Sequence, residues 1–472
     1  MDAIGQSAID DAAKRAIAEG AEKVKLLLYG DYCCATGFAQ VLGNIARELH
    51  ATGKYDIDVI GINYSGDPYD QEKWVGNVFP AMPGGMMNAG AYGDVYGRQR
   101  LLDLMGSGRY DVVYMIQDTF VIEPIVDEIK KTQEALLEHG AKTFKTVWYF
   151  PVDAQLKAGW VETVEKIDFP VVYTEYGKRE VLKHIPELED RLEVIYHGNN
   201  PGNFFPIQDK KDVAEFRKQY FNGKADDRFL IVNINRNQPR KDIARSLMIL
   251  KELWDRGRRP LLYLHMQYED SGGNIFTMAQ QMGLGKEYEF FLPSPKIFNA
   301  NQGMPIDDVN RIYNAADLVL STTLGEGWGL SMTEAMATKT PIVAPDNTSF
   351  SEMGANNRVA LIPSGADPSL WIIKEQDNDR LRPLMDVKLA ADRIEEIMDG
   401  KNLPNVNAAF QWVSDLNWSN ICKDWIRIVD SAAMASAQTN IEAQAQRDIA
   451  GDGGSQFMNR AQRRKLEKKA KK

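Results

Sequence analysis

The chain has 472 residues, 44% of them hydrophobic and 26% charged, with a formal net charge of −10. Because one hydrophobic core usually stops growing at ~250–300 residues, this length predicts two domains. No apolar run approaches the ~18 residues of a membrane span, which excludes a helical integral membrane protein. The N-terminal residues lack the basic start and apolar core of a signal peptide, so we expect a cytoplasmic location, or the host cytoplasm for a viral protein.

The sequence favours neither a disulfide framework nor a metal centre. Its three cysteines are an odd number without a C-x-x-C pair, and its five histidines are scattered without the spacing of metal ligands. Two D-x-D pairs, Asp56 with Asp58 and Asp377 with Asp379, are interpreted as solvated because such pairs are common by chance. We therefore predict that the protein needs no metal and no cofactor.

The N-terminal half alternates short apolar runs with helical patterns. Residues 23–30, "KVKLLLYG", have the composition of a buried strand, and residues 38–53 follow with apolar side chains on one helix face and a closing glycine. Further apolar runs continue to about residue 197, separated by helical patterns such as 121–140. Strands that alternate with helices predict a parallel sheet, and we assign it to an N-terminal domain over residues 22–205.

The same pattern restarts near Asp226 and predicts a second α/β domain. Residues 228–235, "RFLIVNIN", are a strand candidate, and the apolar residues of the next segment share one helix face. We assign residues 206–405 to this C-terminal domain and 406–430 to a helix that packs on a domain. The predicted fold class is α/β, with two Rossmann-like parallel-sheet domains facing each other across a cleft.

The last residues differ in composition from the rest. From about Ser431 the chain is rich in Ala, Gln, Gly and Lys, so residues 431–472 are predicted to be a disordered basic tail. Residues 459–472 hold eight Lys or Arg against one Glu, and this local charge of +7 leaves −17 on the remainder. The tail is interpreted either as a solubilising end or as a site for polyanions such as DNA.

The common nucleotide motifs are missing from the strand–helix junctions. Neither G-x-x-x-x-G-K-[ST] nor G-x-G-x-x-G follows the first strand of either domain. This disfavours a kinase, an ATPase or a dehydrogenase.

Two basic residues follow the first strand of the second domain. Arg236 falls at its carboxyl end, where ligands bind in open α/β sheets, and Lys241 is predicted in the first turn of the next helix. A lysine there opposes the helix dipole, and a bound phosphate would explain it. The alternative is an ordinary exposed lysine.

The stretch "GEGWGLSMTEAMATKTP", residues 325–341, predicts a glycine-rich turn that leads from a strand into a helix. Its backbone amides favour an anion. Glu334 is either a ligand or half of a capping box with Ser331, whereas Glu326 has no capping role. Because carboxylates repel phosphate, we expect both glutamates to bind the hydroxyl groups of a sugar or a ribose.

These segments together resemble a known family. Glu326, Gly327, Gly329 and Glu334 resemble the E-x7-E motif of family-four retaining glycosyltransferases of the GT-B fold, and Arg236 with Lys241 resembles that family's diphosphate-binding pair. Residues 36–53 are similar to its N-terminal glycine loop and helix, and 194–206 to its interdomain segment. The correspondence spans about residues 24–430, in order.

The resemblance implies a donor site in the C-terminal domain. Glu334 would bind the nucleotide ribose, Glu326 the donor sugar, and the amides of Gly327, Trp328, Gly329 and Leu330 the phosphates. Arg236 and Lys241 would stabilise the diphosphate leaving group. The implied reaction transfers a sugar from a nucleotide-diphosphate donor to an acceptor hydroxyl, with retention of configuration and without a metal.

The resemblance also places the acceptor in the N-terminal domain, with Thr36 and Gly37 near the cleft. The chain departs from the family pattern at Lys339, where a small residue is usual, and where relatives carry an active-site histidine this chain has "YFPVD". Asp153 is the substitute catalytic candidate, with Asp118 behind it as an acceptor-binding residue. Both aspartates could alternatively be helix caps.

Two alternatives stay open. The chain is either an enzyme or a non-catalytic module of the same fold that binds a nucleotide sugar or a partner. The basic tail motivates the hypothesis that the acceptor is a hydroxymethylated base in DNA, which would have to be flipped out of its stack.

Overall fold

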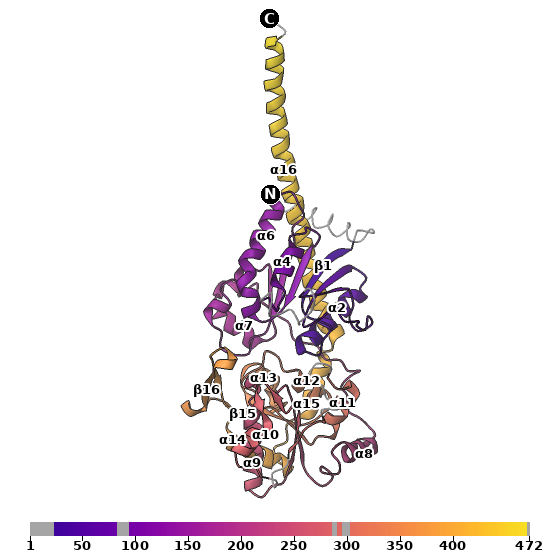
Figure 1. Ribbon diagram of the computed structural model, residues 1–472, viewed down its shortest axis with the longest axis vertical. Helices are drawn as coiled ribbons and strands as arrows, with labels where there is room; N and C mark the ends of the chain where they lie inside the picture. The colour runs from indigo at the N-terminus through magenta and orange to yellow at the C-terminus, as the bar shows by residue number, and fades with distance from the viewer. Residues whose placement is uncertain (1–22, 83–93, 286–289, 295–302, 470–472) are drawn as a thin grey trace.

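The computed structural model describes residues 23–82, 94–285, 290–294 and 303–469, with side chains to Asp448. It contains two parallel sheets, of seven and six strands, in two lobes along the long axis of the molecule (Figure 1). This confirms the predicted fold class. None of the helices in these ranges has the length and hydropathy to cross a membrane.

The N-terminal sheet has the strand order β3-β2-β1-β4-β5-β6-β7, with every neighbouring pair parallel. The order reverses between β1 and β4, and ligands of open α/β sheets bind at such a reversal, beyond the carboxyl ends of the strands. The elements of this domain are β1 (Val24–Asp31), α2 (Gly37–Ala51), β2 (Tyr55–Ile62), β3 (Asn77–Pro80), α4 (Arg98–Met105), β4 (Val112–Ile116), α5 (Thr119–Ile122), α6 (Val126–Glu138), β5 (Lys145–Phe150), β6 (Phe169–Val172), α7 (Glu175–Leu182) and β7 (Glu193–Val194).

The C-terminal sheet has the order β12-β9-β8-β13-β14-β15 and is also parallel. Its reversal lies between β8 and β13, the two strands that precede the predicted donor residues. The elements are α8 (Lys210–Tyr220), β8 (Leu230–Ile234), the 3-10 turn η6 (Pro239–Lys241), α9 (Ile243–Asp255), β9 (Leu261–His265), β10 (Glu269–Asp270), β11 (Gly273–Asn274), α10 (Ile275–Gln281), β12 (Phe290–Phe291), α11 (Ile306–Ala315), β13 (Leu318–Leu320), α12 (Leu330–Ala337), β14 (Ile342–Asp346), α13 (Thr348–Met353), β15 (Ala360–Pro363) and α14 (Val387–Met398).

A hairpin between β15 and α14 reaches from the C-terminal domain to the N-terminal one. It consists of β16 (Trp371–Lys374) and β17 (Arg380–Pro383), which pair antiparallel. Lys157 Nζ donates a hydrogen bond to the carbonyl of Asn378, 2.6 Å away, and the Arg380 guanidinium lies 4.5 Å from the ring centre of Trp160. The prediction that Asp377 is solvated is wrong, because it is 8% exposed and pairs with a buried arginine of β17.

The chain ends in two helices, α15 (Val406–Asp415) and the long α16 (Trp418–Lys469), which returns to the N-terminal domain and packs against α2, β4 and β5 (Figure 1). The fully buried Trp425 of α16 lies edge-on to Tyr114 and Tyr149, with ring centres 5.1 and 4.6 Å apart. This last helical stretch therefore joins the two domains.

The predicted disorder is wrong for residues 431–448, because α16 continues there and packs on the N-terminal domain. Ser436 Oγ donates to the carbonyl of Thr143 at 2.9 Å, and Asn440 Oδ1 accepts the Thr143 N–H at 2.8 Å. Alanine and glutamine are good helix formers, and small side chains such as Ala432, which is fully buried, allow a close approach to the sheet. The basic side chains of 459–472, and the predicted polyanion site, lie outside the described residues.

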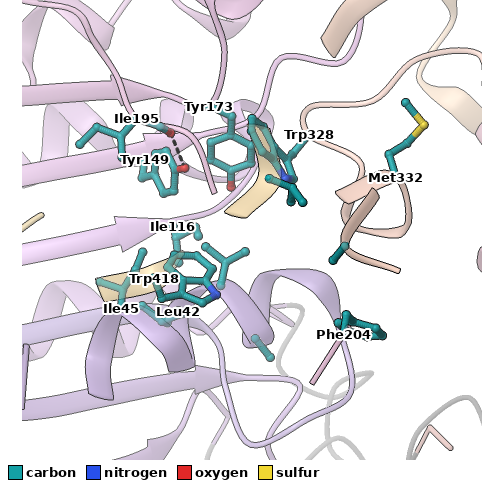
Figure 2. Close-up of a cluster of buried hydrophobic side chains, with 14 of the residues drawn as sticks. Leu42, Ile45, Ile116, Tyr149, Tyr173, Ile195, Phe204, Trp328, Met332 and Trp418 are labelled. Atoms are coloured by element: carbon teal, nitrogen blue, oxygen red, sulfur yellow. Dashed lines mark hydrogen bonds between the residues drawn. The ribbon is translucent and has the colours of Figure 1, made fainter. Parts of the chain in front are cut away.

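A cluster of buried aromatic side chains connects the domains beside the interdomain segment (Figure 2). Tyr149 Oη donates to the carbonyl of Ile195 at 2.6 Å, and His197 Nδ1 lies 2.7 Å from Tyr149 Oη. The ring of His197 is 4.3 Å from that of Tyr173 and 5.3 Å from that of Trp328. The segment predicted to connect the domains, residues 194–206, thus contributes buried side chains to the core between them.

Candidate functional site

The carboxyl ends of β8 and β13 bring two cations onto one carboxylate. Glu326, 6% exposed, receives a hydrogen bond from Lys241 Nζ at Oε1, and Arg240 Nη1 lies 2.9 Å from its Oε2. Burial alone would raise the pKa of Glu326, but the opposite effect of Arg240 and Lys241 is larger, so the pKa lies well below its usual range. Glu326 is therefore an ionised carboxylate between two positive groups.

The three-residue turn η6 produces this arrangement. It places Arg240 and Lys241 side by side, and the left-handed backbone of Asp242 (φ 46°) separates them from α9. The expectation that Lys241 lies in the first turn of that helix is wrong, because the helix begins only at Ile243. The charge of Lys241 is balanced by the carboxylate of Glu326.

The structure does not bring Arg236 into this cluster. Its guanidinium is exposed and pairs with Asp270 at 2.7 Å (Nε to Oδ2) and 3.2 Å (Nη2 to Oδ1). The residue beside Lys241 is instead Arg240, which the sequence analysis missed. Its adjacency to Lys241 after Pro239 was the available signal, because proline favours a tight turn that presents both following side chains.

The glycine-rich turn packs directly against the N-terminal domain. A Cβ added to Gly327 would lie 2.5 Å from Pro151 Cβ, and one on Gly325 would overlap the carbonyl of Asp153. Both glycines are therefore required where the two domains touch. On the far side of the turn, the side chain of Trp328 is 3% exposed and points into the interdomain aromatic cluster (Figure 2), so only its backbone faces the cleft.

The N-terminal glycine loop meets the same turn from the opposite domain. A Cβ on Gly37 would lie 3.4 Å from Leu330 Cδ1, which makes these residues neighbours across the cleft. Gly329 has φ 108°, a backbone conformation that side chains disfavour, and it occupies the N-cap position of α12. The residues predicted to bind phosphates therefore lie at a helix N-terminus that faces the N-terminal domain.

Glu334 lies on α12 and forms no capping box with Ser331. Its Oε2 accepts a hydrogen bond from Tyr313 Oη at 2.7 Å, and Gly329 rather than Ser331 occupies the N-cap. Burial raises the pKa of Glu334 to about 7, although the Tyr313 hydrogen bond opposes the increase. A carboxyl that is close to half-ionised at neutral pH is suited to exchange hydrogen bonds with hydroxyl groups.

A cavity of about 440 Å³ opens at the reversal point of the N-terminal sheet. Its walls include Asp31, the last residue of β1, Asp118, which follows β4, and Gln238 from the C-terminal domain. The cavity therefore lies between the domains, on the N-terminal side of the donor cluster.

Asp118 is one of two carboxyls that line this cavity. It stands at the N-cap position of α5 but makes no side-chain capping bond, so the helix-cap alternative does not hold. Burial raises its pKa to about 7; Asp153 and Asp31 raise it as well, whereas Arg380 and Arg240 lower it. The predicted acceptor-binding residue is thus well placed to interact with a hydroxyl group.

Asp31 was not predicted, although its place directly after a buried strand could have indicated it. It is 4% exposed and accepts hydrogen bonds from Thr36 Oγ1 at 2.7 Å, Asn63 Nδ2 at 3.1 Å and Gln117 Nε2 at 3.4 Å. Burial raises the pKa of Asp31 and these three hydrogen bonds oppose the rise. Thr36 also caps α2 by accepting the N–H of Ala39.

Asp153 is held by three arginines and is not a free base. Arg240 Nε and Arg382 Nη2 lie 3.2 and 3.3 Å from its Oδ2, and Arg380 binds Oδ1. Burial alone would raise the pKa of Asp153, but Arg382, Arg380 and Arg240 bring it well below its usual range. Asp153 is neither a helix cap nor a proton acceptor near neutral pH, and we interpret it as a contact between the domains.

Residues 215–370 match the family described as glycosyl transferases group 1. A D-inositol 3-phosphate glycosyltransferase of Corynebacterium efficiens is 24% identical over 244 residues, which are 50% of this chain and 53% of that protein. One of Corynebacterium kroppenstedtii is 24% identical over 273 residues, 56% of this chain and 55% of that protein. The chain thus spans about half the length of these curated relatives.

Solved structures support the fold over a longer range. Sucrose-phosphate synthase from Thermosynechococcus elongatus superposes with a TM-score of 0.62 at 14% identity, over 87% of this chain and 99% of that one. The Anabaena protein HepE in complex with UDP and glucose gives 0.57 at 13% identity, over 86% and 100%. The chain as a whole therefore has the GT-B fold that the sequence resemblance implied.

Proposed function

We propose that this protein transfers a sugar from a nucleotide-diphosphate donor to an acceptor hydroxyl, with retention of configuration and without a metal. The observation that carries the proposal is the cluster of Glu326, Lys241 and Arg240 at the carboxyl ends of β8 and β13, across the cleft from Gly37. Two cations and a helix N-terminus suit a diphosphate, and the neighbouring carboxylates suit hydroxyl groups. The HepE complex with UDP and glucose supports a donor of this class.

The donor residues have distinct parts in the proposed reaction. Lys241 and Arg240 neutralise the diphosphate, joined by Arg236 if it exchanges Asp270 for phosphate, while the amides from Gly327 to Leu330 bind its oxygens. Glu326 accepts hydrogen bonds from the sugar hydroxyls and Glu334 from the ribose. One well-placed electrostatic donor is worth about 3–4 kcal/mol in comparable sites.

The chemical step breaks the bond between the anomeric carbon and the diphosphate oxygen, and forms one from that carbon to the acceptor oxygen on the same face. The acceptor proton ends on the departing diphosphate. Asp118 orients the acceptor hydroxyl by accepting its hydrogen bond, and Thr36 and Gly37 line the entry to the cleft. Asp153 takes no proton, because its carboxylate is bound to three arginines.

The test is release of nucleotide diphosphate from a panel of UDP-, GDP- and ADP-sugars by the full chain. We expect one donor to be consumed, and Lys241→Ala and Glu334→Ala to lower the rate at least 100-fold while the fold is retained. Lys388→Ala, at an exposed lysine on α14, is the matched control and should retain wild-type turnover. Donor binding without release from any donor would instead favour a non-catalytic module, and wild-type rates in both variants would refute the proposed site.

A further inference from the structure

The cavity beyond β1 and β4 is acidic and contains no positive side chain among its described lining residues. Its polar walls are two carboxyls, three amides and two phenols, and the rest is apolar. These polar residues are Asp31, Asp118, Asn63, Gln117, Gln238, Tyr64 and Tyr96. Recognition of phosphate groups in proteins depends on arginine, lysine or a cluster of backbone amides. The walls instead offer hydrogen-bond donors and acceptors that match hydroxyl groups.

The cations that act on the titratable residues of this cavity already have other partners. Arg98 lies behind Tyr96, with its guanidinium 5.8 Å from the ring centre, and pairs with Asp94 at 3.6 Å. Arg380 and Arg240, which lower the pKa of Asp118, both bind Asp153, and the proposed function assigns Arg240 to the donor diphosphate.

We propose that the acceptor is an uncharged polyol or sugar ring bound through its hydroxyl groups, and that phosphorylated acceptors are disfavoured. The inference rests on the proposed function and adds the acceptor class to it. An uncharged acceptor would distinguish this chain from the relatives that are named D-inositol 3-phosphate glycosyltransferases. A phosphate in this cavity would lie beside the carboxyls of Asp31 and Asp118, with no cation among the described lining residues to compensate it. An ionised carboxyl at contact distance repels a phosphate strongly in a partly buried site. The same repulsion disfavours a nucleotide of DNA as the acceptor.

Binding is measured on the full chain with the donor site saturated by UDP, so that the readout does not depend on turnover. Ligand-observed NMR compares matched pairs: myo-inositol with myo-inositol 3-phosphate, and glucose with glucose 6-phosphate, with glucosamine as the cationic counterpart of glucose. We expect a neutral compound to bind at least tenfold more tightly than its phosphorylated form, about 1.4 kcal/mol. Its signal should weaken in Asp118→Asn.

A gain-of-charge variant makes the test specific to this cavity. Val95 lines the cavity and is 47% exposed, so Val95→Lys adds one cation without disturbing the core, and Val95→Gln is the uncharged control. We expect Val95→Lys to lower the preference for the neutral compound at least fivefold, and Val95→Gln to leave that ratio unchanged.

Three results would overturn the inference: tighter binding of a phosphorylated compound, tenfold tighter binding of glucosamine, or no binding of any neutral compound. Failure of the proposed function would be seen separately, as the absence of nucleotide diphosphate release from every donor.

Discussion

Replacement of Asp153 by asparagine tests whether this residue joins the domains or takes part in catalysis. Asn has the same shape but leaves the guanidinium of Arg382, 1% exposed, with Asp377 as its remaining carboxylate partner. Breaking a buried ion pair by removing one partner typically costs ~3–5 kcal/mol. Because the Asp153 side chain is 20% exposed and Arg382 retains Asp377, we expect a loss of about 3 kcal/mol in the free energy of unfolding.

Calorimetric and urea unfolding of both proteins measure this loss. The matched control is Asp127→Asn, since Asp127 pairs with Lys166 on the surface and its side chain is 57% exposed. Exposed pairs contribute about 0.2–1 kcal/mol, so the control should be nearly neutral. If Asp153→Asn were no more destabilising than Asp127→Asn, the interdomain role would be refuted.

The effect should also depend on pH in a defined direction. The folded-state pKa of Asp153 is lowered, mainly by Arg382 and Arg380 against the effect of burial. Its stabilisation is therefore complete above the pKa of the unfolded carboxyl, about 4, and declines as the pH falls below that value. The difference between wild type and Asp153→Asn should be constant from pH 6 to 8 and smaller at pH 3.

Turnover distinguishes the two interpretations further. Loss of a general base typically lowers a rate by about 10²–10⁴-fold. Asp153 already binds three arginines, so at a temperature where the variant is folded we expect a decrease of less than tenfold. A 100-fold decrease in kcat with an unchanged free energy of unfolding would assign Asp153 to the chemistry instead.

Three further predictions concern other carboxyls and the last helix. Glu334→Gln should stabilise the fold at pH 8 by about 1–3 kcal/mol and have little effect at pH 4. The pKa of Glu334 is raised to about 7, so its ionisation destabilises the folded state as the pH rises from about 4 to 7. Urea unfolding from pH 4 to pH 8 measures this difference in the free energy of unfolding. Asp118→Asn should lower transfer at least tenfold and remove a rise in kcat centred near pH 7, which reflects the pKa of Asp118, while UDP binding is retained. Asn440→Ala should destabilise the fold by about 1–3 kcal/mol in calorimetry, because the N–H and carbonyl of the buried Thr143 lose their bonds to Asn440.

Each of these predictions has an outcome that would contradict it. Glu334→Gln should differ from wild type only where the carboxyl ionises, so an equal effect at pH 4 and pH 8 would exclude a raised pKa. A persistent rise in kcat near pH 7 in Asp118→Asn would assign that rise to another group. Gln446→Ala, at an exposed position of α16, should be neutral, and equal losses in this variant and Asn440→Ala would refute the specific contact to Thr143.

The fold and the placement of Glu326 and Glu334 around the glycine turn were predictable because they depend on local patterns. The strands follow apolar runs such as residues 23–30, and the position of Glu326 and Glu334 around a glycine turn is set by eight residues of sequence. The choice between a ligand role and a capping box for Glu334 was not predictable, because it depends on Tyr313, which lies 21 residues away. Sequence spacing places a carboxyl, but a distant side chain determines its protonation.

The errors at the chain end and at the hairpin have one physical origin. Residues 431–448 have only two large apolar side chains, Met434 and Ile441, yet small residues such as Ala432 and Ser436 pack closely against the sheet. Asp377 likewise has the sequence context of a solvated loop, and it is buried only because Arg382 returns beside it on β17. Composition predicts average exposure and misses burial that arises from a specific partner.

The two aspartates proposed for the acceptor side show how far such partners decide function. Asp118 and Asp153 follow β4 and β5, which are adjacent parallel strands, so the sheet delivers both carboxyls to the same edge. Their protonation nevertheless diverges: Asp118 stays unpaired with a pKa raised to about 7, mainly by burial, while arginines lower the pKa of Asp153 well below its usual range. Those arginines, Arg240, Arg380 and Arg382, all belong to the other domain. The N-terminal sheet therefore delivers two carboxyls to one edge; arginines of the C-terminal domain bind one of them, whereas the other lines the cavity that we propose for the acceptor.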